Sequence, residues 1–222
     1  SVLRFYDRRI RRILPPLIAT ALLTIAIATS FTPSDIKNVG QSLVATFTFL
    51  SNYFFYLETD YFNPFNQSTP LLHTWSLSVE EQYYIFAPFL IYSVSKLQLY
   101  RYLIVIILIL ISFYFAVTLT NSNANLSFYS IHTRAWELLV GTLLAFVGRD
   151  FSGYKPNWKL SECMCFVGIL ALASSFVFFD QTTKHPSFIT IIPVAGTAML
   201  IFYSSHTQYL DPLILFDVPF HL

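Results

Sequence analysis

The chain has 222 residues, of which 55% are hydrophobic, 18% aromatic and only 11% charged. Soluble domains carry about 25% charged residues, so this composition excludes an ordinary soluble domain and indicates a polytopic membrane protein. The formal net charge of +1 gives no electrostatic reason to expect a nucleic-acid partner.

Basic residues are concentrated at the start of the chain. Arg4, Arg8, Arg9, Arg11 and Arg12 all precede an uncharged stretch at 13–34, which is long enough for a membrane helix of about 20 residues. Pro15 and Pro16 would lie in the first turn of that helix, where their missing N–H groups cost nothing. The arginines are interpreted either as a topology anchor on anionic lipid or as a phosphate clamp, and spacing alone favours the anchor.

Six more apolar segments follow, and each is predicted to be helical. The segment at 38–57 is uncharged but rich in polar residues, whereas the later segments are more apolar; these are 73–95, 102–120, 132–148, 160–179 and 186–203. The predicted fold is therefore all-α, a transmembrane helix bundle with about six to seven membrane segments.

The distribution of positive charge predicts an orientation. If the arginine cluster, Lys96 with Arg101, and the basic loop at 149–159 are all cytoplasmic, segment 38–57 must re-enter the membrane or lie on its surface. Lys96 and Arg101 are only two charges and set this orientation weakly. The alternative that segment 38–57 spans the membrane therefore stays open. In the favoured arrangement, segments 73–95 and 132–148 both begin near the extracytoplasmic face, on the side away from the arginine cluster.

The run from Leu71 to Tyr84 contains the most informative polar residues. It places His73, Trp75, Glu80 and Glu81 at the start of an apolar helix, where ionisable residues indicate a functional site. Adjacent residues on a helix point about 100° apart, so only one of the two glutamates faces a given cavity. One carboxylate could stabilise the bundle through a hydrogen bond or an ion pair, and the other could act as a general base.

A second polar group begins segment 132–148. Arg134 and Glu137 are three residues apart and can pair within the helix, and Trp136 lies between them. We expect His73, Trp75, Arg134, Trp136 and Glu137 to line a polar cavity for the molecule on which the protein acts, here called the acceptor. Cys163 and Cys165 lack the partners that a metal site needs and are interpreted as small core residues, so no metal site is predicted.

These motifs, taken in order along the chain, resemble the acyltransferase 3 family of integral-membrane O-acetylases, which act on O-antigen, peptidoglycan and other polysaccharides. The resemblance covers nearly the whole chain and is carried by five segments: 5–15, 49–53, 70–84, 133–141 and 192–197. The most specific of them is the run Leu-His-Thr-Trp-Ser-Leu-Ser-Val-Glu-Glu-Gln at 72–82.

The resemblance implies transfer of an acyl group, usually acetyl, from cytoplasmic acetyl-CoA to a sugar hydroxyl outside the membrane. Arg9 and Arg12 match the family's Arg-x-x-Arg motif, which handles the acyl donor. With this match, the arginine cluster, including Arg8, is interpreted as a clamp for the phosphates of coenzyme A rather than as a topology anchor. The family's catalytic His belongs to an N-terminal helix pair that would precede residue 1. A further family motif would follow residue 222.

The sequence is therefore interpreted as residues 1–222 of a single membrane acyltransferase domain, lacking those N- and C-terminal helices and by itself inactive. Glu80 and Glu81 are predicted to support a catalytic His outside the chain. Acyl-CoA is expected as co-substrate with no permanently bound cofactor, a polysaccharide or lipid-linked glycan as acceptor, and a bacterial inner membrane as location. The alternative is a proton-coupled transporter or flippase of a lipid-linked sugar, with the same carboxylates relaying protons.

Overall fold

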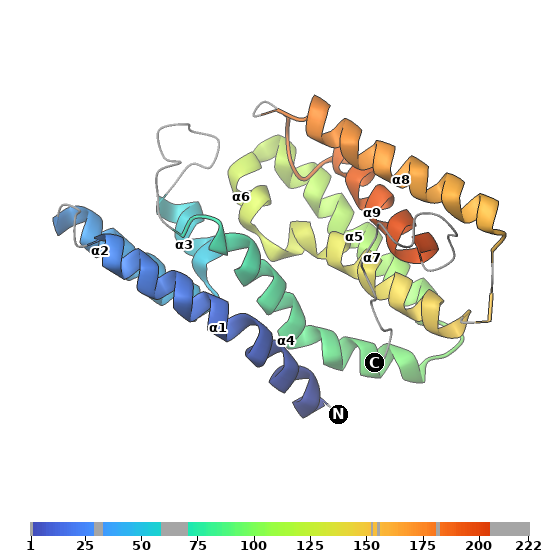
Figure 1. The fold of residues 1–222 in the computed structure, drawn as a ribbon, viewed down its shortest axis with the longest axis horizontal. Coiled ribbons are helices and arrows are strands. Elements are labelled where there is room, and N and C mark those ends of the chain that lie inside the picture. The colour runs from blue at the N-terminus through green and yellow to red at the C-terminus, as the bar shows by residue number, and fades with distance from the viewer. Residues whose placement is uncertain are drawn as a thin grey trace. The chain divides into compact units, whose positions relative to one another are not determined.

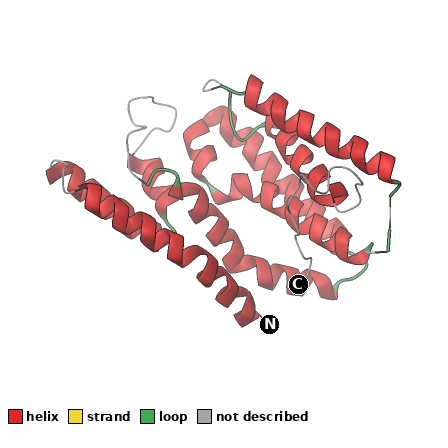
Figure 2. Ribbon diagram, viewed as in Figure 1, coloured by secondary structure: helices red, strands yellow, loops and turns green. Residues whose placement is uncertain are grey.

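The computed structural model describes residues 2–28, 33–58, 71–151, 153–154, 156–180 and 183–204. Within these residues all regular structure is helical, as the composition and periodicity predicted (Figures 1 and 2). The chain forms two compact units, which are described separately below. The first consists of Ser1–Ser93 with Tyr129–Ile131, and the second of Val94–Phe128 with His132–Leu222.

The first unit contains α1 (Val2–Ala28), α2 (Pro33–Phe47), α3 (Ser51–Glu58) and most of α4 (Thr74–Lys96). Helix α1 begins eleven residues before the predicted start at residue 13, so the arginine cluster is itself helical. Pro15 and Pro16 consequently lie inside the helix and not in its first turn. Arginine is a good helix former, and contacts with α4 described below hold this part of α1 in place.

The predicted segment 38–57 is divided into two helices. Phe49 lies at the break between α2 and α3 and has a φ of 54°, in the left-handed region that a bulky residue rarely adopts. Helix α2 has 15 residues and α3 has 8. At 1.5 Å per residue neither reaches the roughly 30 Å of a bilayer core, and the predicted re-entrant or surface position of segment 38–57 stays a prediction.

Polar side chains on one face of α4 connect it to α2 and α3. Thr74 bonds to Thr46 at 2.9 Å, and Ser78, one turn later, bonds to Ser51 at 2.7 Å. A further turn along, the Gln82 amide donates to Asn52 Oδ1 at 2.9 Å and to the Phe49 carbonyl at 2.8 Å. Such hydrogen bonds associate helices where the hydrophobic effect between them is weak, as in a membrane.

The second unit contains the end of α4 and the remaining elements, which match the predicted segments to within two residues except in two places. These elements are α5 (Arg101–Ser122), α6 (Ala124–Tyr129), α7 (Ile131–Asp150), α8 (Trp158–Phe178), the 3₁₀ turn η2 (Phe188–Thr190) and α9 (Ile191–Tyr203). The predicted loop 121–131 contains the short helix α6. The last helix begins at Ile191, because a loop held by the Ser187 cap precedes it.

Helices α8 and α9 form a hairpin whose backbones touch (Figure 1). A Cβ atom added at Gly168 would lie 2.8 Å from the carbonyl oxygen of Gly196, and one added at Gly196 would lie 2.9 Å from the carbonyl oxygen of Gly168. Small residues allow this close approach, which is a common way for membrane helices to associate.

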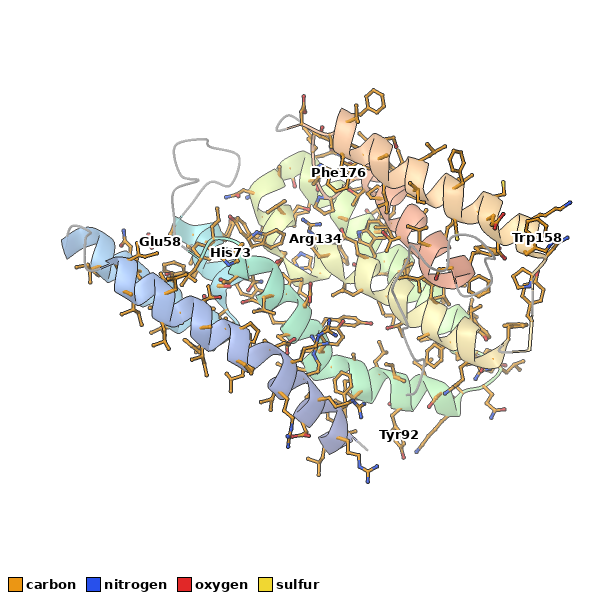
Figure 3. The ribbon with its side chains drawn as sticks, in the orientation of Figure 1. Glu58, His73, Tyr92, Arg134, Trp158 and Phe176 are labelled. Atoms are coloured by element: carbon orange, nitrogen blue, oxygen red, sulfur yellow. The ribbon has the colours of Figure 1, made fainter. Side chains whose placement is uncertain are left out.

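Three of the described helices are long and apolar enough to cross a membrane, namely α1, α5 and α8, and α9 with η2 forms a shorter apolar stretch. Each of the three carries large exposed apolar side chains; Phe178 of α8 is 77% exposed, and Phe176, which is labelled in Figure 3, is 88% exposed. Exposed apolar side chains on this scale indicate contact with lipid. The predicted number of six to seven membrane segments stays a prediction.

Candidate functional site on helices α1 and α4

Arg9 of α1 is bound by two residues of α4. Its Nη2 and Nε atoms donate to Glu81 Oε1 at 2.5 and 3.2 Å. The guanidinium carbon also lies 3.4 Å from the centre of the Tyr84 ring, within the range of a cation–π contact. The side chains of Arg9 and Glu81 are only 19% and 13% exposed, so this ion pair is shielded from water and is stronger than one on the surface.

A second contact fixes the relative direction of the two helices. The Tyr6 hydroxyl, one turn before Arg9, donates to the carbonyl of Ile85, one turn after Glu81, at 2.8 Å. Positions earlier in α1 thus meet positions later in α4, and the two helices run antiparallel. The Tyr6–Ile85 and Arg9–Glu81 contacts together hold the first turns of α1 against α4.

The contact between Arg9 and Glu81 corrects the predicted topology. Charge counting separated the arginine cluster from the two glutamates and assigned them to opposite sides of the membrane. The structure instead places a member of each group within hydrogen-bond distance. The prediction was wrong because it took the membrane helix to begin at residue 13, whereas the arginines occupy the first three turns of α1 and one of them, Arg9, packs against α4.

The neighbouring charged residues have a different environment. Glu80 is exposed and lies about 100° around the helix from Glu81, as for any two adjacent helical residues. Arg8 and Arg12 are also exposed, and both Arg9 and Arg12 are within electrostatic reach of the Glu80 carboxylate. One glutamate is therefore committed to an ion pair, and the other is available to a ligand.

The two predicted acceptor residues of this unit lie at the start of α4. His73 is exposed in the turn that precedes the helix (Figure 3). Trp75 makes an edge-to-face contact with Tyr129, with ring centroids 5.5 Å apart. The Trp75 ring is therefore partly occupied by packing, and stacking on a sugar would have to use its remaining surface.

The other three predicted acceptor residues belong to the second unit. Arg134 Nη1 donates to Glu137 Oε1 and Oε2 at 3.0 and 3.3 Å, as the three-residue spacing predicted, and Arg134 Nε donates to the Phe128 carbonyl. Trp136 is 3% exposed and packs edge-to-face on Phe113, so it is a core residue of this unit. The prediction that these residues share one cavity with His73 and Trp75 stays a prediction.

The structure brings His185 near Arg134 and places Thr190 in a groove with Glu137, and nothing in the sequence indicated either residue. His185 Nδ1 lies 3.4 Å from the hydroxyl of Thr190, and burial together with nearby Arg134 lowers the pKa of His185. A groove of about 290 Å³ extends from Glu137 between α7 and α9. It is lined by Glu137, Gly141 and Leu144 of α7 and by Thr190, Pro193 and Thr197 of η2 and α9.

The remaining predictions concern metals and cysteines. No group of three or more His, Cys, Asp or Glu residues suited to a metal ion occurs in the part of the chain that the structure describes. Cys165 is buried as predicted, but Cys163 is exposed, so its interpretation as a core residue was wrong. Residues two apart on a helix point to different sides, and only one of them can face the packed side of α8.

Helical structure throughout the described residues, with three helices apolar enough to cross a membrane and a shielded ion pair in each unit, Arg9–Glu81 and Arg134–Glu137, indicates an integral membrane protein. Comparison with known families is more specific. The family described as "Acyltransferase domain" matches residues 1–210, and the chain belongs to this family.

Curated relatives come from several bacteria. The chain is 26% identical to the peptidoglycan O-acetyltransferase OatA of Listeria monocytogenes over 96% of its own length and 36% of that protein. It is 26% identical to the O-acetyltransferase OatA of Staphylococcus aureus, and the match covers 30% of that protein. It is 31% identical to an uncharacterized protein of Haemophilus influenzae, and that match covers 89% of the relative. The chain thus spans about a third of the two O-acetyltransferases. No solved structure matches it.

Proposed function

We propose that this chain is part of a membrane O-acyltransferase, which moves an acyl group, in the first place acetyl, from cytoplasmic acyl-CoA to a hydroxyl of a cell-surface or exported polysaccharide. Membership of the acyltransferase family and the names of the two O-acetyltransferase relatives support this proposal. Residues 1–222 would form one membrane domain with six to seven membrane segments, in the inner membrane of a bacterium.

One structural observation carries the proposal: cationic and carboxylate side chains meet within a single unit. Arg9 is bound to Glu81, and exposed Arg12 and Glu80 lie in the same region. Acyl transfer from a thioester to a hydroxyl needs cations for the phosphates of the donor and a group that accepts the hydroxyl proton. We assign the exposed arginines to the donor.

We assign Glu80 a supporting role in the chemistry, orienting a catalytic base or the acceptor hydroxyl. Glu81 is tied to Arg9 by a short ion pair, so it holds the two helices together. On the acceptor side, Glu137 lines the α7–α9 groove and is paired with Arg134, so the two offer charged hydrogen-bonding groups to sugar hydroxyls. His73 and Trp75 remain candidates for the same role.

The test uses the full-length protein and its Glu80→Gln variant, with Glu58→Gln as a matched control. Glu58 is an exposed carboxylate at the end of α3 in the same unit (Figure 3). Mass spectrometry of the surface glycan should show an added acetyl mass with the wild type and Glu58→Gln, and loss of that mass with Glu80→Gln at unchanged amounts of folded protein. Absence of acetylation with the wild type, together with flipping of a lipid-linked sugar, would establish the transporter alternative.

A further inference from the structure

Helices α2 and α3 line a groove of about 570 Å³ in the first unit, here called the α2–α3 groove. One wall is a face of α2 and of the turn after it, where lining residues recur three or four positions apart; among them are Lys37, Gly40, Gln41, Val44 and Thr48. The other wall, from Leu50 to Leu57, is apolar and aromatic. The walls meet at the turn between Thr48 and Leu50, so this turn forms one end of the groove and Lys37 lies at the other.

The polarity of the groove changes along the α2 wall. Lys37 is exposed, and no described residue forms an ion pair with it. The side-chain amide of Gln41 follows one turn later, about 6 Å along the helix axis. Val44 comes next, and the Thr48 hydroxyl already donates to the Val44 carbonyl at 2.9 Å. Starting from Lys37, the wall therefore presents a cation, then an amide, then mainly hydrocarbon.

The length of the groove matches one leaflet of a bilayer. From Lys37 to Thr48 the α2 wall rises by about 16 Å, at 1.5 Å per residue. A tilt of about 20°, the average for membrane helices, would leave about 15 Å, which is half of a hydrocarbon core of about 30 Å. With Lys37 at the membrane surface, the turn at 48–50 would lie near the middle of the bilayer.

A phospholipid presents groups in the same order as this wall. Its phosphate lies at the membrane surface, its ester carbonyls lie just below, and its acyl chains reach to the middle of the bilayer. The ammonium group of a lysine at a helix end extends to the surface and attracts lipid phosphate. Lys37 is the sole basic residue between Arg12 and Lys96 in the sequence, so it alone supplies this charge along α2 and α3.

We propose that the α2–α3 groove binds one anionic phospholipid. The phosphate contacts the Lys37 ammonium, an ester carbonyl accepts from the Gln41 amide, and one acyl chain lies between the two walls. Phosphatidylglycerol fits better than phosphatidylcholine, because its phosphate has no ammonium of its own head group beside it. The chain fills the space between two helices that are each too short to span the membrane. This proposal does not depend on the acyl transfer proposed above.

The head-group contact is tested with the full-length protein in nanodiscs of phosphatidylcholine that contain a minor fraction of phosphatidylglycerol. Lipid mass spectrometry measures the enrichment of phosphatidylglycerol on the protein. Lys37→Gln should lower the enrichment about fivefold, the contribution of one lysine at an anionic membrane surface. Lys184→Gln is the matched control, since Lys184 is another exposed lysine but lies in the loop before η2. It should change the enrichment by less than about twofold.

The chain contact is tested at Gly40, which lines the groove and where an added Cβ would meet nothing within 4 Å. Gly40→Ala should leave the enrichment unchanged within about twofold, because most of the groove stays open. Gly40→Leu occupies part of the groove and should lower the enrichment at least about fourfold, the effect of excluding one methylene group. Alanine and leucine are both better helix formers than glycine, so the two variants should fold equally well.

Photocrosslinking then locates the acyl chain directly. Phosphatidylglycerol with a photoreactive group at the end of one chain should label the turn at 48–50 or the start of α3. Labelling confined to other segments would show that another part of the full-length protein fills the groove, and would overturn the proposal. It would equally be overturned by unchanged enrichment in Lys37→Gln, by an equal loss in Lys184→Gln, or by a folded Gly40→Leu protein that binds the lipid as well as Gly40→Ala.

Discussion

Replacing Gly168 with alanine should destabilise the protein, although alanine is the better helix former. The added Cβ would lie 2.8 Å from the carbonyl oxygen of Gly196 and 3.1 Å from Leu200 Cγ. The nearest obstacle is backbone, which cannot rotate away as a side chain can. To restore an ordinary separation of 3.4 Å or more, α8 and α9 would have to move apart by roughly half an ångström, enough to weaken each dispersion contact along the hairpin.

Two opposing effects determine how much Gly168→Ala changes the free energy of unfolding. Alanine gains about 1 kcal/mol over glycine in helix propensity, and an overpacked contact costs about 1–3 kcal/mol. Because the clash involves both backbones, we expect the cost to prevail, with a net loss of about 1–2 kcal/mol. Gly141 of α7 provides the control, since a Cβ there would meet nothing within 4 Å. Gly141→Ala should therefore be neutral or stabilising by up to about 1 kcal/mol.

The assay is reversible unfolding of the full-length protein in detergent micelles, with the free energy of unfolding compared between the two variants. Gly196→Ala adds a further check, because its Cβ would meet Gly168 across the same contact. Once one substitution has separated the helices, the second should cost less, so the double variant should lose less than the sum of the single losses. A Gly168→Ala protein at least as stable as Gly141→Ala would refute the close backbone contact.

Three further outcomes are expected from unfolding measurements. Arg9→Gln and Glu81→Gln should each cost about 2 kcal/mol, and the double variant should cost little more than either, because both remove one shared ion pair; additive losses would contradict this. Asn52→Ala should cost about 1–3 kcal/mol, since it removes one of the two hydrogen bonds that the Gln82 amide donates and the bond that Asn52 donates to the buried Tyr129 carbonyl, and a loss below about 0.5 kcal/mol would contradict the buried network. The lowered pKa of His185 means that the unfolded chain binds a proton before the folded one, so the free energy of unfolding should rise from about pH 5 to 7. His185→Asn should flatten that rise.

Composition and periodicity alone determined the helical class of this protein and the approximate bounds of its later helices. Segments 102–120 and 160–179 are uncharged or nearly so over the length of a membrane span, and the structure ends each within two residues of its predicted bounds. The pairing of Arg134 with Glu137 also followed from sequence, because two residues three positions apart on a helix are always neighbours.

Contacts between distant residues were decided only by the tertiary structure. Nothing in the spacing of Arg9 and Glu81, 72 positions apart, says that they meet, and rules that count charges per loop cannot detect an arginine buried against another helix. The same holds for His185, which reads as an ordinary loop residue until folding brings it to Thr190 and Arg134. Sequence periodicity fixes which face of a helix is polar, but packing decides what that face touches. For this reason the sequence could name the charged residues of α1, whereas only the structure showed that Arg9 pairs with Glu81 of another helix.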